Sequence, residues 1–273
     1  MLNFGQSIFL GAVQGLTEFI PVSSSGHLII ARSVFNISDA NGLSVDAVLQ
    51  LASALTLLFY FRKDFVALLK YISGCFKTSQ TQADISTMGV SPKTLLAILV
   101  LGSLVPAIAG VFLESTMETV FRNSEFVVVT LVLGSILFWT AEAHAAFDKP
   151  LTAKRGIFVG IFQTLALLPG MSRAGATISG GLLLGLTRET AAKISFFLGF
   201  PLLFGSGLKK LLELWQTGIL SAIGVELLLG AVVSFLVGLA AIHWMISFLK
   251  NHKLNAFAWY RVILAVLIIA FAV

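Results

Sequence analysis

Charge is scarce in this sequence. Charged residues make up only 11% of the 273 residues, whereas soluble domains carry roughly a quarter. Hydrophobic residues make up 57%, so the composition excludes an ordinary soluble domain. The net charge of +5 is spread over short segments between apolar runs. Such a distribution indicates the orientation of a membrane protein and argues against a nucleic-acid partner.

Cysteine and a basic leader are also lacking. The single cysteine, Cys75, excludes an internal disulfide and a cysteine-based metal cluster. No basic residue precedes the first apolar segment, and polar residues interrupt that segment, so we expect no cleaved signal peptide. The apolar runs do not alternate with polar residues as barrel strands do, so helices are the expected spanning elements.

Long apolar runs predict six transmembrane helices, each near the ~20 residues that cross a bilayer core. The predicted spans are 46–62, 95–113, 124–142, 190–208, 224–249 and 256–273. Two more apolar segments, 5–34 and 156–186, are interrupted midway by Pro, Gly and Ser, which is typical of re-entrant hairpins that face a protected cavity. The predicted fold class is therefore an all-α polytopic membrane protein with six transmembrane helices and two re-entrant helical hairpins.

The two interrupted segments resemble each other. GAVQGLTEFIPVSSSG at Gly11–Gly26 and GIFQTLALLPGMSRAG at Gly160–Gly175 share Gly-x-x-Gln, Pro-x-x-Ser and a final Gly. Gln14 and Gln163 are 149 residues apart, and the prolines match with one residue of slip. Three predicted spans follow each segment, and an odd number would invert the second half. A single membrane domain, 1–273, is thus predicted to contain two inverted-topology repeats, about 1–145 and 150–273.

The cations between spans predict the orientation. Most fall on one side of a six-span arrangement: Arg62, Lys63, Lys70, Lys77, Lys93, Lys149, Lys154, Arg155, Lys250 and Lys253. We assign that side to the cytoplasm, which places both termini outside. Lys209 and Lys210 fall on the other side and do not fit this pattern. The first hairpin then enters from outside and the second from inside, so they meet near the middle of the membrane.

The first interrupted segment, EFIPVSSSGH, carries reactive side chains. Gln14 and Glu18 are four residues apart and share one helical face, and an ionisable group inside a membrane segment suggests function. Pro21 ends a helix, and a helix that begins after Ser25 or Gly26 would present its N-terminus to an anion. A serine near His27 is a plausible nucleophile and base. The alternatives are a helix-capping role for Glu18 or for one of the serines, Ser23, Ser24 and Ser25, and a hydrogen-bonded interfacial role for His27.

The second interrupted segment, LLPGMSRAGATISGG, contains Arg173. An arginine at mid-membrane costs about 2.5 kcal/mol or more, so it needs a reason. Its neighbours are small or carry hydroxyls: Gly170, Ser172, Gly175 and Thr177. This combination favours a phosphate clamp over an arginine that extends to lipid headgroups. Glu18 would then orient His27 or, with Gln14, hold a divalent cation that bridges to the phosphate.

Two motifs carry a resemblance to a known family. QGLTEFIPVSSSGH and LLPGMSRAGATISGG resemble the signature regions of the bacterial undecaprenyl-diphosphate phosphatases, the bacitracin-resistance family. The resemblance extends to Asp46–Ser53 and to AWYRVIL at Ala258–Leu264. Glu18, Ser24, His27 and Arg173 match the functional positions of that family, Gln14 stands at its Glu-or-Gln position, and Ala174 replaces its usual serine.

The resemblance implies removal of the terminal phosphate of undecaprenyl diphosphate, with Mg²⁺ or Ca²⁺, in a pocket open to the periplasmic side of the plasma membrane. Such a reaction recycles the lipid carrier of cell-wall synthesis and gives bacitracin resistance. We expect Ser24 to attack phosphorus or to position water, with His27 as base and then acid. The predicted site consists of catalytic Ser24, His27, Glu18 and Arg173; phosphate-binding Ser23, Ser25, Gly26, Ser172, Gly175 and Thr177; supporting Gln14, Gln163 and Gln50; and cation-binding Glu18 and Gln14.

Other interpretations stay open at this point. Inverted repeats with broken helices are also typical of secondary transporters, so a lipid-phosphate flippase is the alternative. Another membrane lipid-phosphatase superfamily is excluded, because Ser179 stands where its histidine should follow Ser172-Arg173. Expected partners are a polyprenyl diphosphate and bilayer lipids, with a second copy of the chain in a homodimer as a further option. Glu142 and Glu226 show no partner in the sequence, and Trp215, Trp244, Trp259 and Tyr260 fit interfacial anchoring.

Overall fold

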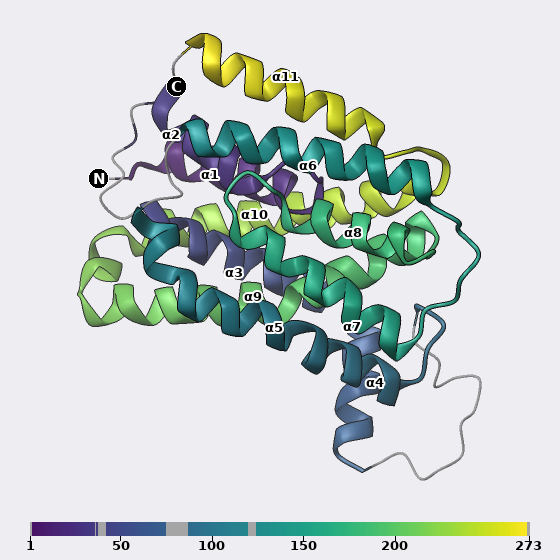
Figure 1. Cartoon of the computed structure of the whole chain (residues 1–273). Coiled ribbons are helices and arrows are strands. Elements are labelled where there is room, and N and C mark those ends of the chain that lie inside the picture. Colours follow the sequence, from purple (N-terminus) through teal and green to yellow (C-terminus); the bar gives the residue numbers. More distant parts are fainter. Residues whose placement is uncertain (1, 36, 38–41, 75–86, 120–123, 272–273) are drawn as a thin grey trace.

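The computed structural model describes residues 2–35, 37, 42–74, 87–119 and 124–271, and these residues form helices and no strand (Figure 1). The elements in chain order are α1 (Phe4–Phe19), α2 (Ser24–Val34), α3 (Gly42–Tyr60), α4 (Arg62–Ile72), α5 (Pro92–Thr119), α6 (Ser124–His144), α7 (Ala153–Phe162), the 3-10 helix η2 (Gln163–Leu167), α8 (Arg173–Leu183), α9 (Arg188–Gln216), α10 (Ile219–Asn251) and α11 (Asn255–Phe271). The predicted all-α class is confirmed for the part of the chain that the structure describes.

Four helices are long and apolar enough to cross a membrane: Pro92–Leu113, Glu125–His144, Arg188–Gln216 and Ile223–Asn251. The predicted span 46–62 differs from the structure, because the chain bends by 79° between Val45–Tyr60 and Arg62–Ile72. This bent pair counts as a fifth candidate span, and Asn255–Ala270 is a shorter apolar helix. The last two residues of the predicted span 256–273 lie outside the described residues.

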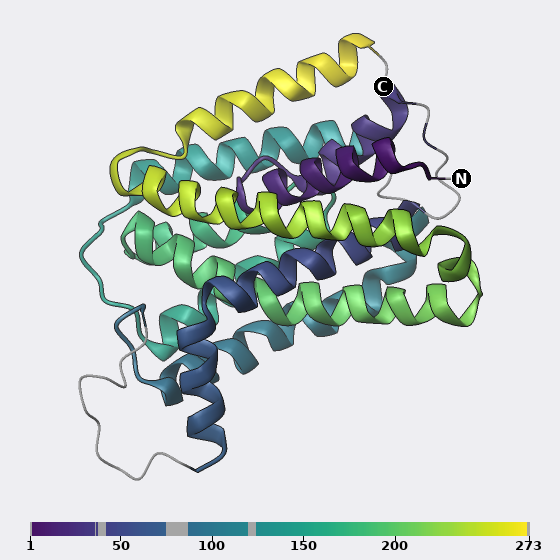
Figure 2. The same ribbon diagram turned by 180° about the vertical axis from the view of Figure 1, so that it is seen from behind.

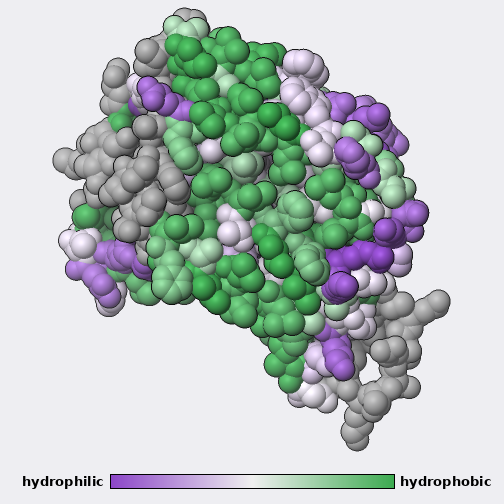
Figure 3. Space-filling view, in the orientation of Figure 1, coloured by the Kyte–Doolittle hydropathy of each residue, from purple (hydrophilic) through white to green (hydrophobic). Residues whose placement is uncertain are grey.

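Large apolar side chains cover the outer faces of the long helices. Val111 and Phe112 of α5 are 74% and 80% exposed, and exposed Val, Leu and Ile side chains continue over α6, α10 and α11. Figure 3 shows one such apolar face, on the side of α5, α6 and α11, with hydrophilic residues gathered at its edges. An apolar surface of this size is unfavourable in water and favourable in a bilayer. The protein is therefore a multi-pass helical membrane protein.

In both interrupted segments, the helix is broken between a proline and a serine that follows it by two or three residues. After Pro21, Ser23 caps α2 and its Oγ accepts a hydrogen bond from Gly26 N, at 3.3 Å. After Pro169, Ser172 caps α8 and accepts from Gly175 N at 3.2 Å. The φ angles of the two serines are 75° and 72°, in a region that residues other than glycine rarely adopt. The two segments thus use the same kind of serine cap.

The prediction that a helix begins after Ser25 or Gly26 is wrong, because α2 already begins at Ser24. The reason is that Ser23, and neither of the next two serines, supplies the cap. Helix α8 begins at the corresponding residue, Arg173, which is 149 positions later in the chain. Ser24 and Arg173 are therefore equivalent first residues of two short helices.

The two halves of the chain pack against each other reciprocally. Helix α1 packs along α10 of the second half, and α7 packs along α5 of the first half. Both crossings rest on glycine: a Cβ at Gly11 would overlap Gly230 O, and a Cβ at Gly160 would overlap Gly102 O. Helix α3 lies against α9, and α6 against α11 (Figures 1 and 2). Small residues allow this close approach of helices in membranes.

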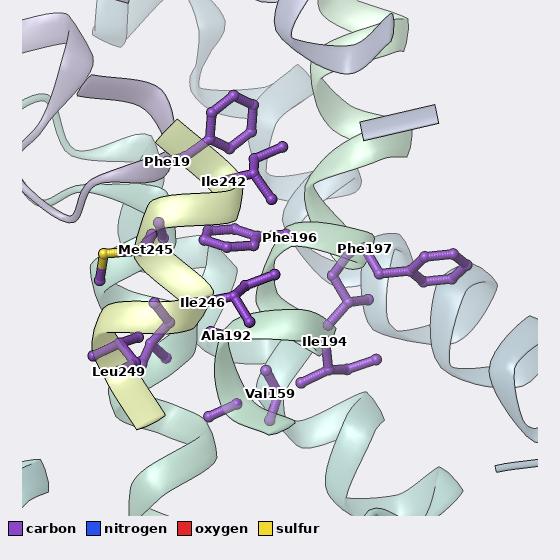
Figure 4. Packing of buried hydrophobic residues seen from close by; sticks show 14 of the residues in the cluster. Phe19, Val159, Ala192, Ile194, Phe196, Phe197, Ile242, Met245, Ile246 and Leu249 are labelled. Carbon is purple, nitrogen blue, oxygen red and sulfur yellow. The ribbon is translucent and has the colours of Figure 1, made fainter. Parts of the chain in front are cut away.

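The largest hydrophobic cluster surrounds α9 and fixes the end of α1. Figure 4 shows Phe19 from α1 beside Ile242 of α10 and above Phe196 of α9. The rings of Phe19 and Phe196 are 5.7 Å apart in an edge-to-face arrangement, and both side chains are fully buried. This packing holds the last turn of α1, and with it Glu18, at one place in the bundle.

The first and last described residues lie at the same end of the bundle, and the α6–α7 and α10–α11 connections lie at the opposite end (Figures 1 and 2). These connections and the residues beside them hold five of the cations that predicted the cytoplasmic side: Lys149, Lys154, Arg155, Lys250 and Lys253. Lys210, which did not fit that pattern, forms an ion pair of 3.0 Å with Glu213. Lys77 lies outside the described residues.

Replacing Gly11 by alanine should destabilise the crossing of α1 and α10. The new Cβ would overlap a backbone oxygen that cannot move away, and overpacking of this kind costs about 1–3 kcal/mol. We expect a lower melting temperature for Gly11→Ala in detergent. Gly205→Ala in α9 is the matched control, because no atom lies within 4 Å of its new Cβ. Equal melting temperatures for both variants would contradict the tight crossing.

Candidate active site

Glu18 is the centre of a polar cluster within the apolar bundle. It lies one residue before the end of α1, and only 5% of it is exposed. Its Oε2 accepts hydrogen bonds from Ser24 Oγ at 2.8 Å and from Gln14 Nε2 at 3.0 Å. Its Oε1 accepts from Arg173 Nε at 3.2 Å, which makes an ion pair. One carboxylate therefore joins α1, α2 and α8.

Arg173 keeps one donor free. Its NH1 group donates to the carbonyl oxygen of Ser195 at 3.0 Å, and its guanidinium lies over Gly199, where a Cβ would overlap it. Its NH2 group is buried and has no partner in the described structure. A buried guanidinium donor without a partner is unfavourable, and a phosphate oxygen is a strong acceptor for it. Sequence analysis missed Gly199, which follows a run of apolar residues without any motif.

The three serines of the first segment differ in their contacts. Ser23 Oγ caps α2, and Ser25 Oγ lies 3.3 Å from Ser23 Oγ. Among the three, Ser24 donates to a carboxylate in the described structure, that of Glu18. A carboxylate that accepts the serine O–H can accept its proton during attack. The geometry therefore favours Ser24 as the nucleophile and Glu18 as its base.

His27 does not bond Ser24 or Glu18 in the described structure, which differs from the expected serine–histidine pair. Its Nδ1 lies 2.7 Å from the carbonyl oxygen of Ser23, and its Nε2 lies 2.7 Å from Tyr260 Oη. A carbonyl only accepts, so Nδ1 carries the hydrogen, and Nε2 of the neutral ring accepts from Tyr260. Tyr260, expected to anchor the membrane interface, thus positions His27 from α11. The rings are also stacked, with centroids 5.7 Å apart.

Several predicted phosphate-binding residues are occupied within their own helices. Gly26 N and Gly175 N already donate to the capping serines, Ser23 and Ser172. Thr177 Oγ1 donates to Arg173 O at 2.8 Å and contacts Ser195 Oγ. These three donors are already used within the helix starts, whereas the NH2 group of Arg173 is free in the described structure.

The three predicted supporting glutamines have different surroundings. Gln14 is fully buried beside Glu18, and its Nε2 also lies 3.3 Å from Ser53 Oγ. Gln163 is fully buried in η2, and neither of its amide atoms has a partner in the described structure. Gln50 is half-buried in α3. The structure thus brings Gln14 to Glu18, and it records no hydrogen bond between the described site and Gln163 or Gln50.

The cation-binding prediction can be compared with the donor atoms. Gln14 Oε1 is a buried oxygen without a partner, and Nε2 of the same amide donates to the Glu18 carboxylate. Hard divalent cations prefer such oxygen ligands. Across the described residues, no group of three or more His, Cys, Asp or Glu side chains could hold a metal. The cation site at Glu18 and Gln14 therefore stays a prediction.

Arg261 is a fully buried cation that sequence analysis did not single out. Its NH1 donates to Met171 O and its NH2 to Gly170 O, each at 3.0 Å, and the guanidinium also bonds carbonyls of Thr130 and Leu131 in α6. Its Cζ lies 4.9 Å from the ring centroid of Phe138. Arg261 thus ties α11 and α6 to the turn before Arg173. An arginine within an otherwise apolar span was the signal that could have found it.

Glu142 has a partner that the sequence did not reveal. Its Oε1 accepts from Arg188 Nε at 2.9 Å and from Leu254 N at 2.8 Å. These bonds join the end of α6 to the start of α9 and to the α10–α11 connection. The charge of Glu142 is thus balanced by a structural ion pair away from Glu18.

Replacing Arg261 by glutamine should destabilise the turn that carries Arg173. The shorter side chain would leave several buried carbonyls without donors, at about 1–3 kcal/mol for each. We expect a markedly lower melting temperature in detergent for Arg261→Gln, and an intermediate one for Arg261→Lys, which keeps the charge but loses the planar fork. Arg62→Gln, on the exposed surface of α4, serves as the control. An unchanged melting temperature for Arg261→Gln would contradict this role.

Comparison with known proteins places the chain in a family. Residues 7–267 match the family described as bacitracin resistance protein BacA. A Mycobacterium marinum protein named undecaprenyl-diphosphatase is 39% identical over 274 residues, which cover 98% of this chain and 94% of that protein. A Rubrobacter xylanophilus protein of the same name is 39% identical over 276 residues, or 99% and 98% of the two chains. A Corynebacterium jeikeium protein named undecaprenyl-diphosphatase 1 is 39% identical over 98% of this chain and 94% of its own length. The chain therefore belongs to the bacitracin resistance protein BacA family.

Proposed function

We propose that this protein is an undecaprenyl-diphosphate phosphatase. It hydrolyses the terminal phosphate of undecaprenyl diphosphate and yields undecaprenyl phosphate and inorganic phosphate. The observation that carries the proposal is the buried Glu18 carboxylate, which accepts the Ser24 hydroxyl beside an Arg173 guanidinium with a free donor. The names of the relatives support the same reaction. In this role the protein recycles the lipid carrier of bacterial cell-wall synthesis and confers bacitracin resistance.

We also propose that the halves, about 1–145 and 150–273, are inverted-topology repeats with six spans and two re-entrant hairpins. Two observations support this arrangement: the matched turns at Ser23 and Ser172, and the reciprocal crossings at Gly11 and Gly160. In the bacterial plasma membrane, the cation-rich end faces the cytoplasm, and both termini face the periplasm. The site opens toward the periplasm, where the diphosphate enters while the prenyl chain stays among the helices.

The chemical step starts at Ser24. Its Oγ attacks the terminal phosphorus, its proton passes to Glu18 Oε2, and the bond from that phosphorus to the bridging oxygen breaks. Undecaprenyl phosphate leaves with the electron pair, and the phosphoryl group stays on Ser24. Glu18 then releases this proton to the leaving undecaprenyl phosphate or to water. A water molecule next attacks phosphorus and gives a proton to Glu18, and the Glu18 carboxyl returns that proton to Ser24 Oγ as the bond from phosphorus to Oγ breaks and inorganic phosphate leaves. A direct attack by water that Ser24 positions is the other route.

Arg173 and His27 complete the proposed site. The free NH2 group of Arg173 binds an oxygen of the terminal phosphate, where negative charge must be held through the reaction. His27 is positioned by Ser23 and Tyr260, and protonation of its ring turns Nε2 into a donor, which can then exchange its contact with Tyr260 for one with a phosphate oxygen. A divalent cation, Mg²⁺ or Ca²⁺, would be held by Glu18 and Gln14 together with the substrate, and it would offset phosphate charge.

Replacing Ser24 by alanine should abolish most phosphate release. We expect a loss of about 10³-fold or more in kcat for inorganic phosphate release from undecaprenyl diphosphate, because the attacking group is removed. Ser25→Ala, which removes a hydroxyl without a carboxylate contact, should retain most activity. Near-normal turnover by Ser24→Ala would contradict the assignment.

The wild-type protein in the same assay separates the two functional classes. A phosphatase releases inorganic phosphate, whereas a flippase or transporter without chemistry releases none from the diphosphate with any cation. A phosphorylated Ser24 in acid-quenched samples would support the covalent route. Its absence during measured turnover would favour positioned water.

Replacing Gln14 by glutamate should strengthen cation binding. The extra carboxylate would stand next to Glu18, and a divalent cation would reduce the repulsion between the two. We expect a several-fold lower Mg²⁺ concentration at half-maximal activity. Gln50→Glu adds the same charge in α3 and should leave this concentration unchanged. An unchanged value for Gln14→Glu would exclude Gln14 as a cation ligand.

A further inference from the structure

A cavity of about 460 Å³ lies at the base of the second interrupted segment. It lies between the start of α7 and the end of α8, with the α6–α7 connection along its rim. Its polar lining consists of Lys149, Lys154, Arg155 and Thr152. None of these residues belongs to the Glu18 site.

The positive charge of this cavity is not neutralised within the described structure. Lys149 and Lys154 are exposed, and the described residues provide no ion pair to either of them or to Arg155. Arg155 is half-buried, and its NH1 group donates to the carbonyl oxygen of Pro150 at 2.8 Å. Asp148 precedes Lys149 in the chain but does not line the cavity. Three cations without a facing carboxylate favour an anionic ligand.

The position of Lys149 is set by the protein before any ligand binds. Its backbone N donates to Gly185 O at 3.1 Å. Its aliphatic stem passes over Gly185, where a Cβ would come within 2.9 Å of Cδ. Gly185 has a φ of 86°, which favours glycine for a second reason. The α8–α9 connection thus places the ammonium group of Lys149 at the cavity.

The rest of the lining is apolar. Phe158 of α7 and Leu183 at the end of α8 are 44% and 37% exposed, and Leu184 follows them. The hydrophilic residues at this end of the protein border its apolar face (Figure 3). A cavity with cations on one side and exposed apolar side chains on the other matches a molecule that is itself charged at one end and apolar beyond. Inorganic phosphate would leave the apolar lining, Phe158 and Leu183, without a contact.

We propose that this cavity binds an anionic glycerophospholipid of the cytoplasmic leaflet. Lys149, Lys154 and Arg155 hold its phosphate and headgroup, and the upper part of an acyl chain lies against Phe158 and Leu183. The lipid contacts α7 and α8 together, and α8 carries Arg173 at its other end. It thereby stabilises the second hairpin from its base.

Lipid retention by the purified full chain tests the proposal. Native mass spectrometry is performed in detergent with phosphatidylglycerol and phosphatidylcholine of identical acyl chains. The wild type should retain phosphatidylglycerol in preference to phosphatidylcholine. Lys149→Gln/Lys154→Gln should bind phosphatidylglycerol about 25-fold more weakly, from about fivefold for each cation near a membrane surface. Both replaced side chains are exposed, so the melting temperature without anionic lipid should not change.

The matched control is Lys63→Gln/Lys70→Gln. It removes the same charge from exposed positions of α4, outside the cavity, and should retain phosphatidylglycerol as the wild type does. Equal losses in both double variants would show a general effect of net charge and overturn the site. No loss in Lys149→Gln/Lys154→Gln would overturn it as well.

A second variant addresses the choice of lipid over free phosphate. Phe158→Ser, at an exposed position, should weaken phosphatidylglycerol binding, because it removes the apolar contact. Unchanged binding by this variant, or displacement of the lipid by inorganic phosphate at equal concentration, would indicate a free-anion site instead and overturn the lipid assignment.

Discussion

The ion pair between Glu18 and Arg173 is the interaction on which the rest of the site depends. A buried carboxylate is costly unless charge and hydrogen bonds compensate it, and here Arg173, Ser24 and Gln14 supply both. Ser24 and Arg173 are the first residues of α2 and α8, so the compensation of one charge also fixes how the two interrupted segments meet. The same carboxylate is thereby placed to accept the serine proton.

Three features of the surrounding structure hold α2 and α8 in place beside Glu18. Serine caps with positive φ begin both short helices, and such strained conformations persist where the structure around them is rigid. Close crossings at Gly11 and Gly160 bring each interrupted segment against a long helix of the other half. Arg261 binds the carbonyls of the turn before Arg173. Local strain at the site is thus balanced by tight packing outside it.

The parts of the fold that local sequence patterns control were predictable. Apolar runs indicated the long helices, and Pro21 indicated the end of α1. The bend between α3 and α4 was not predictable, because no proline or glycine marks it in the sequence. The early start of α2 was not predictable either, because three consecutive serines offer a cap and only the structure shows that Ser23 is the one used. The partner of His27 was missed for a different reason, since Tyr260 is 233 residues away in the chain.

The sequence by itself determined that this is a helical membrane protein, that two similar interrupted segments exist, and that a carboxylate, serines, a histidine and an arginine stand in them. These properties follow from composition and from short motifs, which act on neighbouring residues. Only the tertiary structure decided that Ser24 faces Glu18 while His27 faces Tyr260, and that Arg173 keeps a donor free. Such pairings depend on how whole helices are rotated and packed, and packing joins residues from opposite halves of the chain.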